Sequence, residues 1–161
     1  MCAPSDYRID EPRPGTIAYV HTHDRRPMIL VNPPTLANPM GQFSHATIVP
    51  DNARIAFVSG QVGVDNDGRT AAPDCYGQTR QAFANLRAVV EHLGATPDDI
   101  VKMFTLVCGS DSFAEFARAR TEVFADWFPD AAYPAHSAAV VAALASPELL
   151  VEIEAIVAVP Q

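Results

Sequence analysis

Two carboxylates and one imidazole interrupt otherwise apolar segments near the end of the chain. Glu152 and Glu154 alternate with apolar residues in LLVEIEAIVAV, which places both on one face of a predicted strand. His136 interrupts YPAHSAAVVAAL, a run of small and branched apolar residues. A polar group inside an apolar strand needs a partner when it is buried. These residues are candidates for proton transfer, and equally for an exposed sheet edge or a satisfied core or interface histidine.

A second candidate lies where the predicted strand AFVSGQ ends in Ser59, Gly60 and Gln61. A serine hydroxyl and backbone N–H groups at such a point can hold an anion. A β-bulge or a turn explains the same residues without a ligand, and the three residues alone favour that interpretation.

Other reaction chemistries find little support. HTHD offers His21, His23 and Asp24 as a possible metal corner, but further ligands are not evident in the sequence. Cys108 and His136 could form a thiol nucleophile with its base, although a strand cysteine is more often a small buried hydrophobe. The sequence contains no GxGxxG, P-loop, HExxH or GxSxG motif, so we expect neither a metal nor a nucleotide cofactor.

Length and composition favour one soluble domain. A chain of 161 residues builds one real core and does not comfortably build two. Eleven basic and nineteen acidic residues, a formal charge of −8, argue against nucleic-acid or anionic-membrane partners. The three cysteines form no CxxC pair, and neither a leader nor an apolar run of ~20 residues is visible. A cytoplasmic location is therefore expected.

The pattern of apolar residues and turn signals predicts the elements that position these side chains. Residues 1–27 form a predicted N-terminal extension, because prolines and the run HTHDRR interrupt any regular period, and residues 28–161 form the domain. The expected strands are 28–31, 43–49, 53–64, 100–109, 134–144 and 149–159, with PDN as the turn between the second and third. The expected helices are 76–93, stopped by Gly94, and 113–127, with Asp111 as N-cap and Pro129 after its end.

The order β-β-β-α-β-α-β-β predicts an α+β fold in which two amphipathic helices cover one face of a single sheet. The other face is also largely apolar in sequence. Because no third helix is available to bury it, a symmetric oligomer is the economical solution.

Six segments in order resemble the Rid family, the YjgF-like reactive intermediate deaminases, over about residues 28–159. They are GQFSHA (41–46), FVSGQVGVD (57–65), QTRQAFANLRAVVEHLGA (78–95), DDIVKMFTLV (98–107), FPDAAYPAHSAAVVAAL (128–144) and VEIEAIV (151–157). The resemblance implies a chorismate-mutase-like subunit with a mixed sheet, in a homotrimer whose sheets pack toward a central barrel. It also implies ligand sites in clefts between subunits, and hydrolysis of enamines and imines such as 2-aminoacrylate.

The resemblance assigns site roles to seven positions. The motif that carries the family's carboxylate-gripping arginine reads Pro134-Ala135-His136-Ser137, so His136 stands at the arginine position. Two further departures replace a tyrosine and a helix asparagine, namely Phe43 and Ala117. The positions that keep the pattern are Ser59, Gly60, the backbone N–H of Ala138, and the glutamate Glu152.

These departures predict a divergent family member with a changed substrate. An imidazole lacks the permanent bidentate charge of a guanidinium, so simple amino-acid-derived enamines should bind poorly. The most concrete expectation is hydrolytic deamination of a 2-aminomuconate-like compound, with Glu152 and His136 as general acid and base. If His136 acts as a protonated donor, activity should fall as pH rises through its pKa. The alternatives are a tautomerisation, dehydration or cyclisation in a biosynthetic pathway, and a ligand-binding trimer without turnover.

Overall fold

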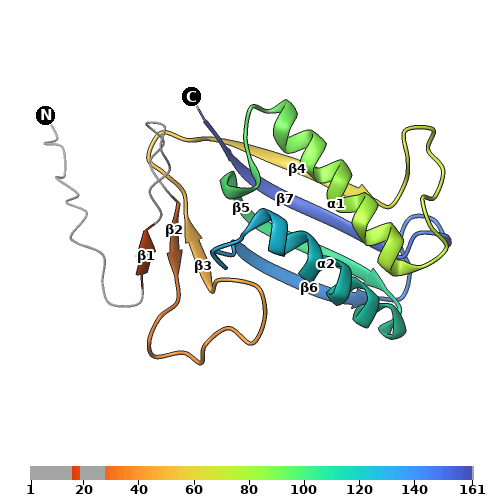
Figure 1. Ribbon diagram of the computed structural model, residues 1–161, viewed down its shortest axis with the longest axis horizontal. Coiled ribbons are helices and arrows are strands. Elements are labelled where there is room, and N and C mark those ends of the chain that lie inside the picture. The colour runs from red at the N-terminus through yellow and green to blue at the C-terminus, as the bar shows by residue number, and fades with distance from the viewer. Residues whose placement is uncertain (1–15, 19–27, 161) are drawn as a thin grey trace, which may run out of the picture.

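The computed structural model describes residues 16–18 and 28–160, which form two sheets and two α-helices (Figure 1). The strands are β1 Thr16–Ala18, β2 Ile29–Val31, β3 Ala46–Ile48, β4 Arg54–Val62, β5 Ile100–Cys108, β6 Ala135–Val141 and β7 Val151–Val159. The helices are α1 Cys75–His92 and α2 Phe113–Trp127, with short 3₁₀ turns η1 Pro97–Asp99 and η2 Ser110–Ser112.

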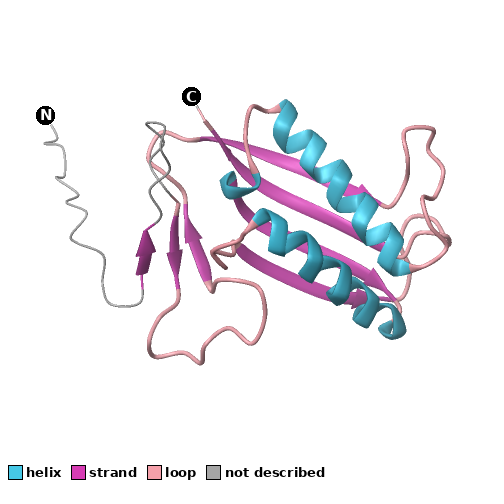
Figure 2. Cartoon of the chain, viewed as in Figure 1, coloured by secondary structure: helices cyan, strands magenta, loops and turns pink. Residues whose placement is uncertain are grey.

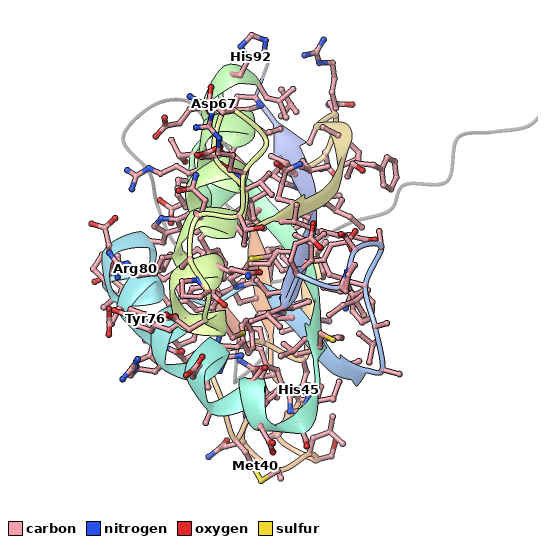
Figure 3. The ribbon with its side chains drawn as sticks, turned by 90° about the vertical axis from the view of Figure 1, so that its right-hand side faces the viewer. Met40, His45, Asp67, Tyr76, Arg80 and His92 are labelled. Atoms are coloured by element: carbon pink, nitrogen blue, oxygen red, sulfur yellow. The ribbon has the colours of Figure 1, made fainter. Side chains whose placement is uncertain are left out.

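The main sheet has the strand order β4-β7-β5-β6 and carries both helices on one face (Figure 2). Strands β5 and β6 are parallel, while β7 is antiparallel to both of its neighbours. Seen edge-on in Figure 3, the helices form one layer beside the sheet, with Tyr76 and Arg80 on the outer side of that layer. The predicted α+β class, with two helices over a mixed sheet, is confirmed.

Side-chain alternation along the strands builds the core between the sheet and the helices. On β5 and β7 every second residue is sealed from solvent, including Met103, Val107, Val151 and Ile153. The helices add large apolar side chains, which are Phe83, Leu86, Val90, Phe116 and Phe124. Burying each of these stabilises the fold by about 1.5–3 kcal/mol relative to leaving it exposed.

The helix boundaries follow local capping chemistry. The Asp74 side chain accepts a hydrogen bond from the Gly77 N–H at 2.7 Å and starts α1. Gly94, at φ 72°, follows its end, as expected for a position that needs the left-handed region. The predicted Asp111 N-cap of α2 is wrong. The 3₁₀ turn η2 occupies that position, and Ser112 is the N-cap without a side-chain bond.

The first three strands form a separate small sheet in the order β1-β2-β3. Strand β1 lies within the predicted N-terminal extension and pairs with β2, although no regular period is visible there in the sequence. Three residues are too short to show a period. The HTHD segment lies outside the described residues.

The predicted turn at PDN exists, with Asn52 at φ 66°, but its flanking strands do not pair with each other. Strand β3 pairs with β2, and β4 pairs with β7. A single bridge between Ser44 and Ala135 connects the segment before β3 to the edge of the main sheet. The two strands are therefore not a hairpin, because tertiary pairing with the C-terminal strand replaces local pairing.

The face of the main sheet away from the helices is apolar and uncovered in the single chain. Phe57 is 80% exposed on this face and Ile55 is 40% exposed. Exposed aromatic side chains of this size on a sheet face are typical of a surface that another protein surface covers. Within the described residues, neither helix has the length and apolar character needed to span a bilayer.

Candidate functional site

A β-bulge between β4 and β7 organises the first group of predicted site residues. Val58 pairs with Ala155 and Gln61 pairs with Ile153, so two residues of β4 stand opposite one residue of β7. The extra residue bends the strand and leaves backbone groups outside the ladder. The bulge interpretation favoured by the sequence is confirmed at Ser59 and Gly60.

Glu152 lies directly against this bulge. A Cβ added to Gly60 would overlap the Glu152 carboxyl group, so only glycine leaves room for that side chain in its present position. Glu152 is half-buried, whereas Glu154 is exposed. Among the described residues, Glu152 has no ion pair. We call Ser59, Gly60 and Glu152 the bulge half-site: a carboxylate at a distorted backbone on the open face.

His136 lies on the opposite face of the sheet. It pairs with Met103 in the register of β5 and β6, and Met103 points into the core under the helices. His136 Nε2 and the hydroxyl oxygen of the fully buried Thr105 are 2.9 Å apart and share a hydrogen bond. The imidazole lies 6.4 Å from the Phe116 ring and 6.0 Å from the Phe124 ring, centroid to centroid. The side chain is therefore part of an aromatic pocket beneath α2.

The charge state of His136 follows from this environment. Burial, helped by the nearby Arg120 and Lys102 charges, lowers the pKa of His136 from 6.5 to about 3. The imidazole is neutral at pH 7 and cannot supply the protonated donor considered from the sequence. Within the described part of the chain, its Nδ1 is buried without a hydrogen-bond partner.

Arg120 is a residue of this pocket that the sequence reasoning missed. Its guanidinium carbon lies 5.3 Å from the centroid of the Phe116 ring and 5.8 Å from that of Phe124. Its Nε is buried and has no hydrogen-bond partner among the residues that the structure describes, and burial lowers the pKa of the group. The signal was available, because Phe116, Arg120 and Phe124 follow one another at four-residue helical spacing, which places a cation on the apolar stripe of α2. We call Arg120, His136, Phe116, Phe124 and Tyr133 the histidine pocket.

The predicted substrate contacts other than Ser59 and Gly60 lie around this pocket. Ala117 lies on α2 beside Phe116, and its carbonyl accepts a hydrogen bond from the Thr121 hydroxyl at 2.8 Å. Phe43 is half-buried, and its segment reaches the pocket through Gln42, whose amide nitrogen is 3.5 Å from the Tyr133 hydroxyl. Ala138 is exposed on the same face of β6 as His136, two residues further along.

Glu152 and His136 do not come together within one chain. Glu152 pairs with Leu106, whereas His136 pairs with Met103. Residues 103 and 106 point to opposite faces of the strand they share, because side chains alternate at every residue. The expected pairing of acid and base across one cleft is therefore absent from the single chain.

The geometry does not support the cysteine and metal alternatives within the described residues. Cys108 pairs with Val141 on the open face, opposite to His136, so the two cannot act as a nucleophile and base in one chain. Cys75 is buried, with its sulfur 3.7 Å from the Thr79 hydroxyl oxygen. Over residues 16–18 and 28–160, no group of three or more His, Cys, Asp or Glu side chains is placed to hold a metal ion.

Comparison with known proteins places the chain in a family. The sequence model of the family described as endoribonuclease L-PSP matches residues 35–159. The 2-iminobutanoate/2-iminopropanoate deaminase of Salmonella typhimurium is 34% identical over 106 residues, which cover 66% of this chain and 80% of that protein.

Solved structures agree with that match. A protein of unknown function from the Rid family of Yersinia pestis is 35% identical, with a TM-score of 0.73 and coverage of 81% of this chain and 98% of that one. The TdcF protein of Escherichia coli, solved with bound serine, is 31% identical, with a TM-score of 0.59 and coverage of 68% and 84%. This chain belongs to the same family, that of the YjgF-like Rid proteins.

Proposed function

We propose that this protein hydrolyses an imine or enamine to a carbonyl compound and ammonia, with Glu152 as the residue that moves the proton. The observation that carries the proposal is the position of the Glu152 carboxylate against Gly60 at the bulge, on a face otherwise dominated by apolar side chains. The relative named as a 2-iminobutanoate/2-iminopropanoate deaminase supports the reaction class. A 2-aminomuconate-like compound is the most concrete larger substrate.

The chemistry needs one group that accepts and then returns a proton. Water adds to the carbon of the protonated imine while the Glu152 carboxylate takes one of its protons, which forms a C–O bond and leaves a neutral amine on the same carbon. The Glu152 carboxylic acid then gives that proton to the amine nitrogen, the C–N bond breaks to release ammonia, and the hydroxyl proton passes through the Glu152 carboxylate to ammonia as the carbonyl forms. An enamine enters this sequence after its β-carbon takes a proton. A positioned acid/base group of this kind contributes about 10²–10⁴-fold to the rate.

The bulge supports this role by supplying polar groups beside the carboxylate. Ser59 is exposed next to Gly60, so its hydroxyl is available to a ligand held near Glu152. Backbone N–H groups freed from the ladder at a bulge can stabilise developing negative charge. The bulge half-site therefore offers a carboxylate, a hydroxyl and backbone N–H groups to a ligand. In a single chain this half-site is open to solvent.

We further propose that a second subunit completes the site in a homotrimer. The bulge half-site and the histidine pocket lie on opposite faces of one chain, so both can border one cleft only when they come from different copies. The exposed Phe57 and Ile55 supply apolar surface for that contact. Sedimentation or light scattering should give a mass of three chains, and a monomer would contradict this part of the proposal.

In this proposal His136 acts as a neutral structural and binding residue. Its hydrogen bond to Thr105 fixes the ring, and its lowered pKa keeps it uncharged throughout the range in which enzymes usually work. The proton transfer is left to Glu152.

The test is ammonia release from freshly generated 2-iminobutanoate, 2-aminoacrylate and 2-aminomuconate, with wild-type protein and two matched variants. Glu152→Gln should lower kcat/KM by about 10²–10⁴-fold. Glu154→Gln removes an exposed carboxylate two residues away on the same face and should leave activity within about twofold.

Two results would contradict the proposal. The first is no ammonia above background from any of the three compounds. The second is an equal loss of activity in the two variants. If the protein instead changed the double-bond position of these compounds without releasing ammonia, a tautomerase would replace the deaminase.

A further inference from the structure

Arg120 is a half-buried cation that has no ion-pair partner in the described chain. None of the carboxylates in residues 16–18 and 28–160 forms an ion pair with it, whereas the exposed Arg80 and Arg87 are paired with Glu122 and with Glu91 and Asp126, respectively. Burying part of a charge without a partner costs free energy, and burial lowers the pKa of Arg120, so the pocket lacks an opposite charge within the described chain. An anion would complete it.

The surroundings of Arg120 orient the guanidinium. It lies against the faces of Phe116 and Phe124, which are both fully buried and held in place by the core. Nε of the group is buried and has no hydrogen-bond partner in the described chain, so at least one of its donors is left for a ligand. A planar fork held between aromatic rings matches the two oxygens of a carboxylate.

A second unpartnered polar atom lies beside the same two rings. His136 Nδ1 is buried without a hydrogen-bond partner, while Nε2 is engaged with Thr105. If the Thr105 hydroxyl donates to Nε2, the neutral ring carries its proton on Nδ1 and can donate one further hydrogen bond. Two buried nitrogens without partners in the described chain, Arg120 Nε and His136 Nδ1, therefore belong to groups that lie against the same two rings beneath α2.

The rim of the pocket holds further polar groups. The Gln42 side chain connects α2 to Tyr133: its carbonyl oxygen accepts from the Thr121 hydroxyl at 3.1 Å, and its amide nitrogen lies 3.5 Å from the Tyr133 hydroxyl. Tyr133 itself stacks on Phe124 at 5.7 Å between ring centroids. The contacts of Gln42 therefore join Tyr133 to α2 through neutral, hydrogen-bonding groups.

We propose that Arg120 is an anion-binding residue that recognises the carboxylate of a small-molecule ligand, with His136 Nδ1 as a second donor. This inference rests on the proposed function, because it assigns the end of the substrate that is held while Glu152 of another copy acts on the imine. It predicts that the substrate carries a carboxylate although His136 itself is uncharged.

The experiment measures binding directly, at pH 7.5, by calorimetric or NMR titration of the full-length protein. The probes are 2-oxobutanoate and its methyl ester, which has the same carbon skeleton but no negative charge. Wild-type protein should bind the acid at least about tenfold more tightly than the ester, since a charge-assisted pair of hydrogen bonds is lost in the ester.

Two arginine variants on one helix provide the matched comparison. Arg120→Met keeps an apolar stem in the pocket and should weaken binding of the acid by about tenfold to hundredfold, with little effect on the ester. Arg118→Met changes an exposed arginine that stacks on Tyr76 at 4.2 Å and should leave both affinities unchanged. Arg120→Lys keeps the charge but loses the fork, so its affinity for the acid should fall between the two.

The inference is wrong if wild-type protein binds acid and ester equally, or if Arg120→Met binds the acid as wild type does. If Arg120→Met does not fold, the acid-to-ester ratio of the wild type and the Arg120→Lys variant decide instead. Loss of the oligomer in Arg120→Met, with no binding of the acid to wild type, would show that a partner subunit's carboxylate occupies Arg120, and would also overturn the inference.

These results separate the two proposals. Carboxylate binding that depends on Arg120 without any ammonia release would contradict the deaminase function alone. Ammonia release that is insensitive to Arg120 substitution would contradict the carboxylate assignment alone.

Discussion

The bulge half-site and the histidine pocket place their ionisable groups in opposite environments. Glu152 lies on an open sheet face beside a backbone irregularity, half-buried and without an ion pair in the described chain. His136 lies under a helix among aromatic rings, and burial lowers its pKa to about 3. One region keeps a carboxyl group accessible to water, while the other holds an imidazole neutral because burial disfavours its charged form.

This difference in environment indicates which of the two residues is suited to proton transfer with a substrate. A group that exchanges protons with a substrate needs contact with that substrate and a charge that can change near neutral pH. Glu152 has the accessible position, while His136 has a rigid, dehydrated one that suits packing and hydrogen bonding. Glu152 and His136 both interrupt apolar strands in the sequence, but they have different roles in the folded chain.

The largest expected difference between the regions is in stability. His136→Ala removes the contacts with Phe116 and Phe124 and leaves Thr105 without its partner, so the free energy of unfolding should fall by about 2–4 kcal/mol. Glu152→Ala, in the bulge half-site, should change it by no more than about 0.5 kcal/mol. Urea unfolding of the two variants measures both values, and equal losses would remove the distinction between the regions.

The next effect concerns pH. Because the pKa of His136 is about 3 in the folded protein and about 6.5 in the unfolded chain, the unfolded state binds the additional proton. Its contribution to stability is complete above pH 6.5 and is lost as pH falls toward 3, at up to about 1.4 kcal/mol per pH unit. Urea unfolding between pH 7 and pH 4 should show this slope.

The control for the pH effect is His136→Phe, which fills the pocket with a ring that cannot be protonated. The slope assigned to His136 should disappear in this variant. A slope identical to that of wild type would place the titrating group elsewhere.

The smallest expected effect is a displacement within the bulge half-site. Gly60→Ala places a Cβ where the Glu152 carboxyl group lies, so the side chain must rotate away. Ammonia release should fall about tenfold, since misplacing an acid/base group raises the barrier by about 1.4 kcal/mol. Stability should remain within about 1 kcal/mol of wild type, because the carboxylate lies at the surface of the sheet.

Gly41→Ala is the matched control for this change. An added Cβ there meets the Phe43 ring at 3.6 Å, an ordinary van der Waals distance. Its activity should match wild type, and a loss similar to that of Gly60→Ala would show that the effect does not act through Glu152.

The long elements were predictable from sequence because their signals are local. The stripe that begins at Ala82 and ends at Leu93 repeats at helical spacing, and α1 covers Cys75–His92. Strands at 28–31 and 43–49 were predicted, but β1 was not. The separate small sheet was not predictable either, since it depends on the pairing of β1 and β3 with β2. The short segment before α2 was also missed, because a 3₁₀ turn and a helix cap share the same polar residues.

For the candidate site, the residues were predictable but their arrangement was not. The polar interruptions at Glu152 and His136 are visible in the sequence, and the bulge at Ser59 and Gly60 was the favoured interpretation of SGQ. Their positions on opposite faces depend on the register between β5, β6 and β7, which is set by pairings between strands distant in sequence. Arg120 was overlooked, because an arginine on an apolar stripe is usually read as a side chain that reaches solvent.

The sequence by itself determined the α+β class, the two helices, the alternation of Glu152 with buried residues, and membership of the Rid family, since each depends on local periodicity or on ordered motifs. Only the tertiary structure decided that His136 is neutral, that Glu152 contacts Gly60, and that Arg120 Nε is buried without a partner in the described part of the chain. The physical reason is that solvation and charge depend on what surrounds a group. Those surroundings come from elements that meet only in the folded chain.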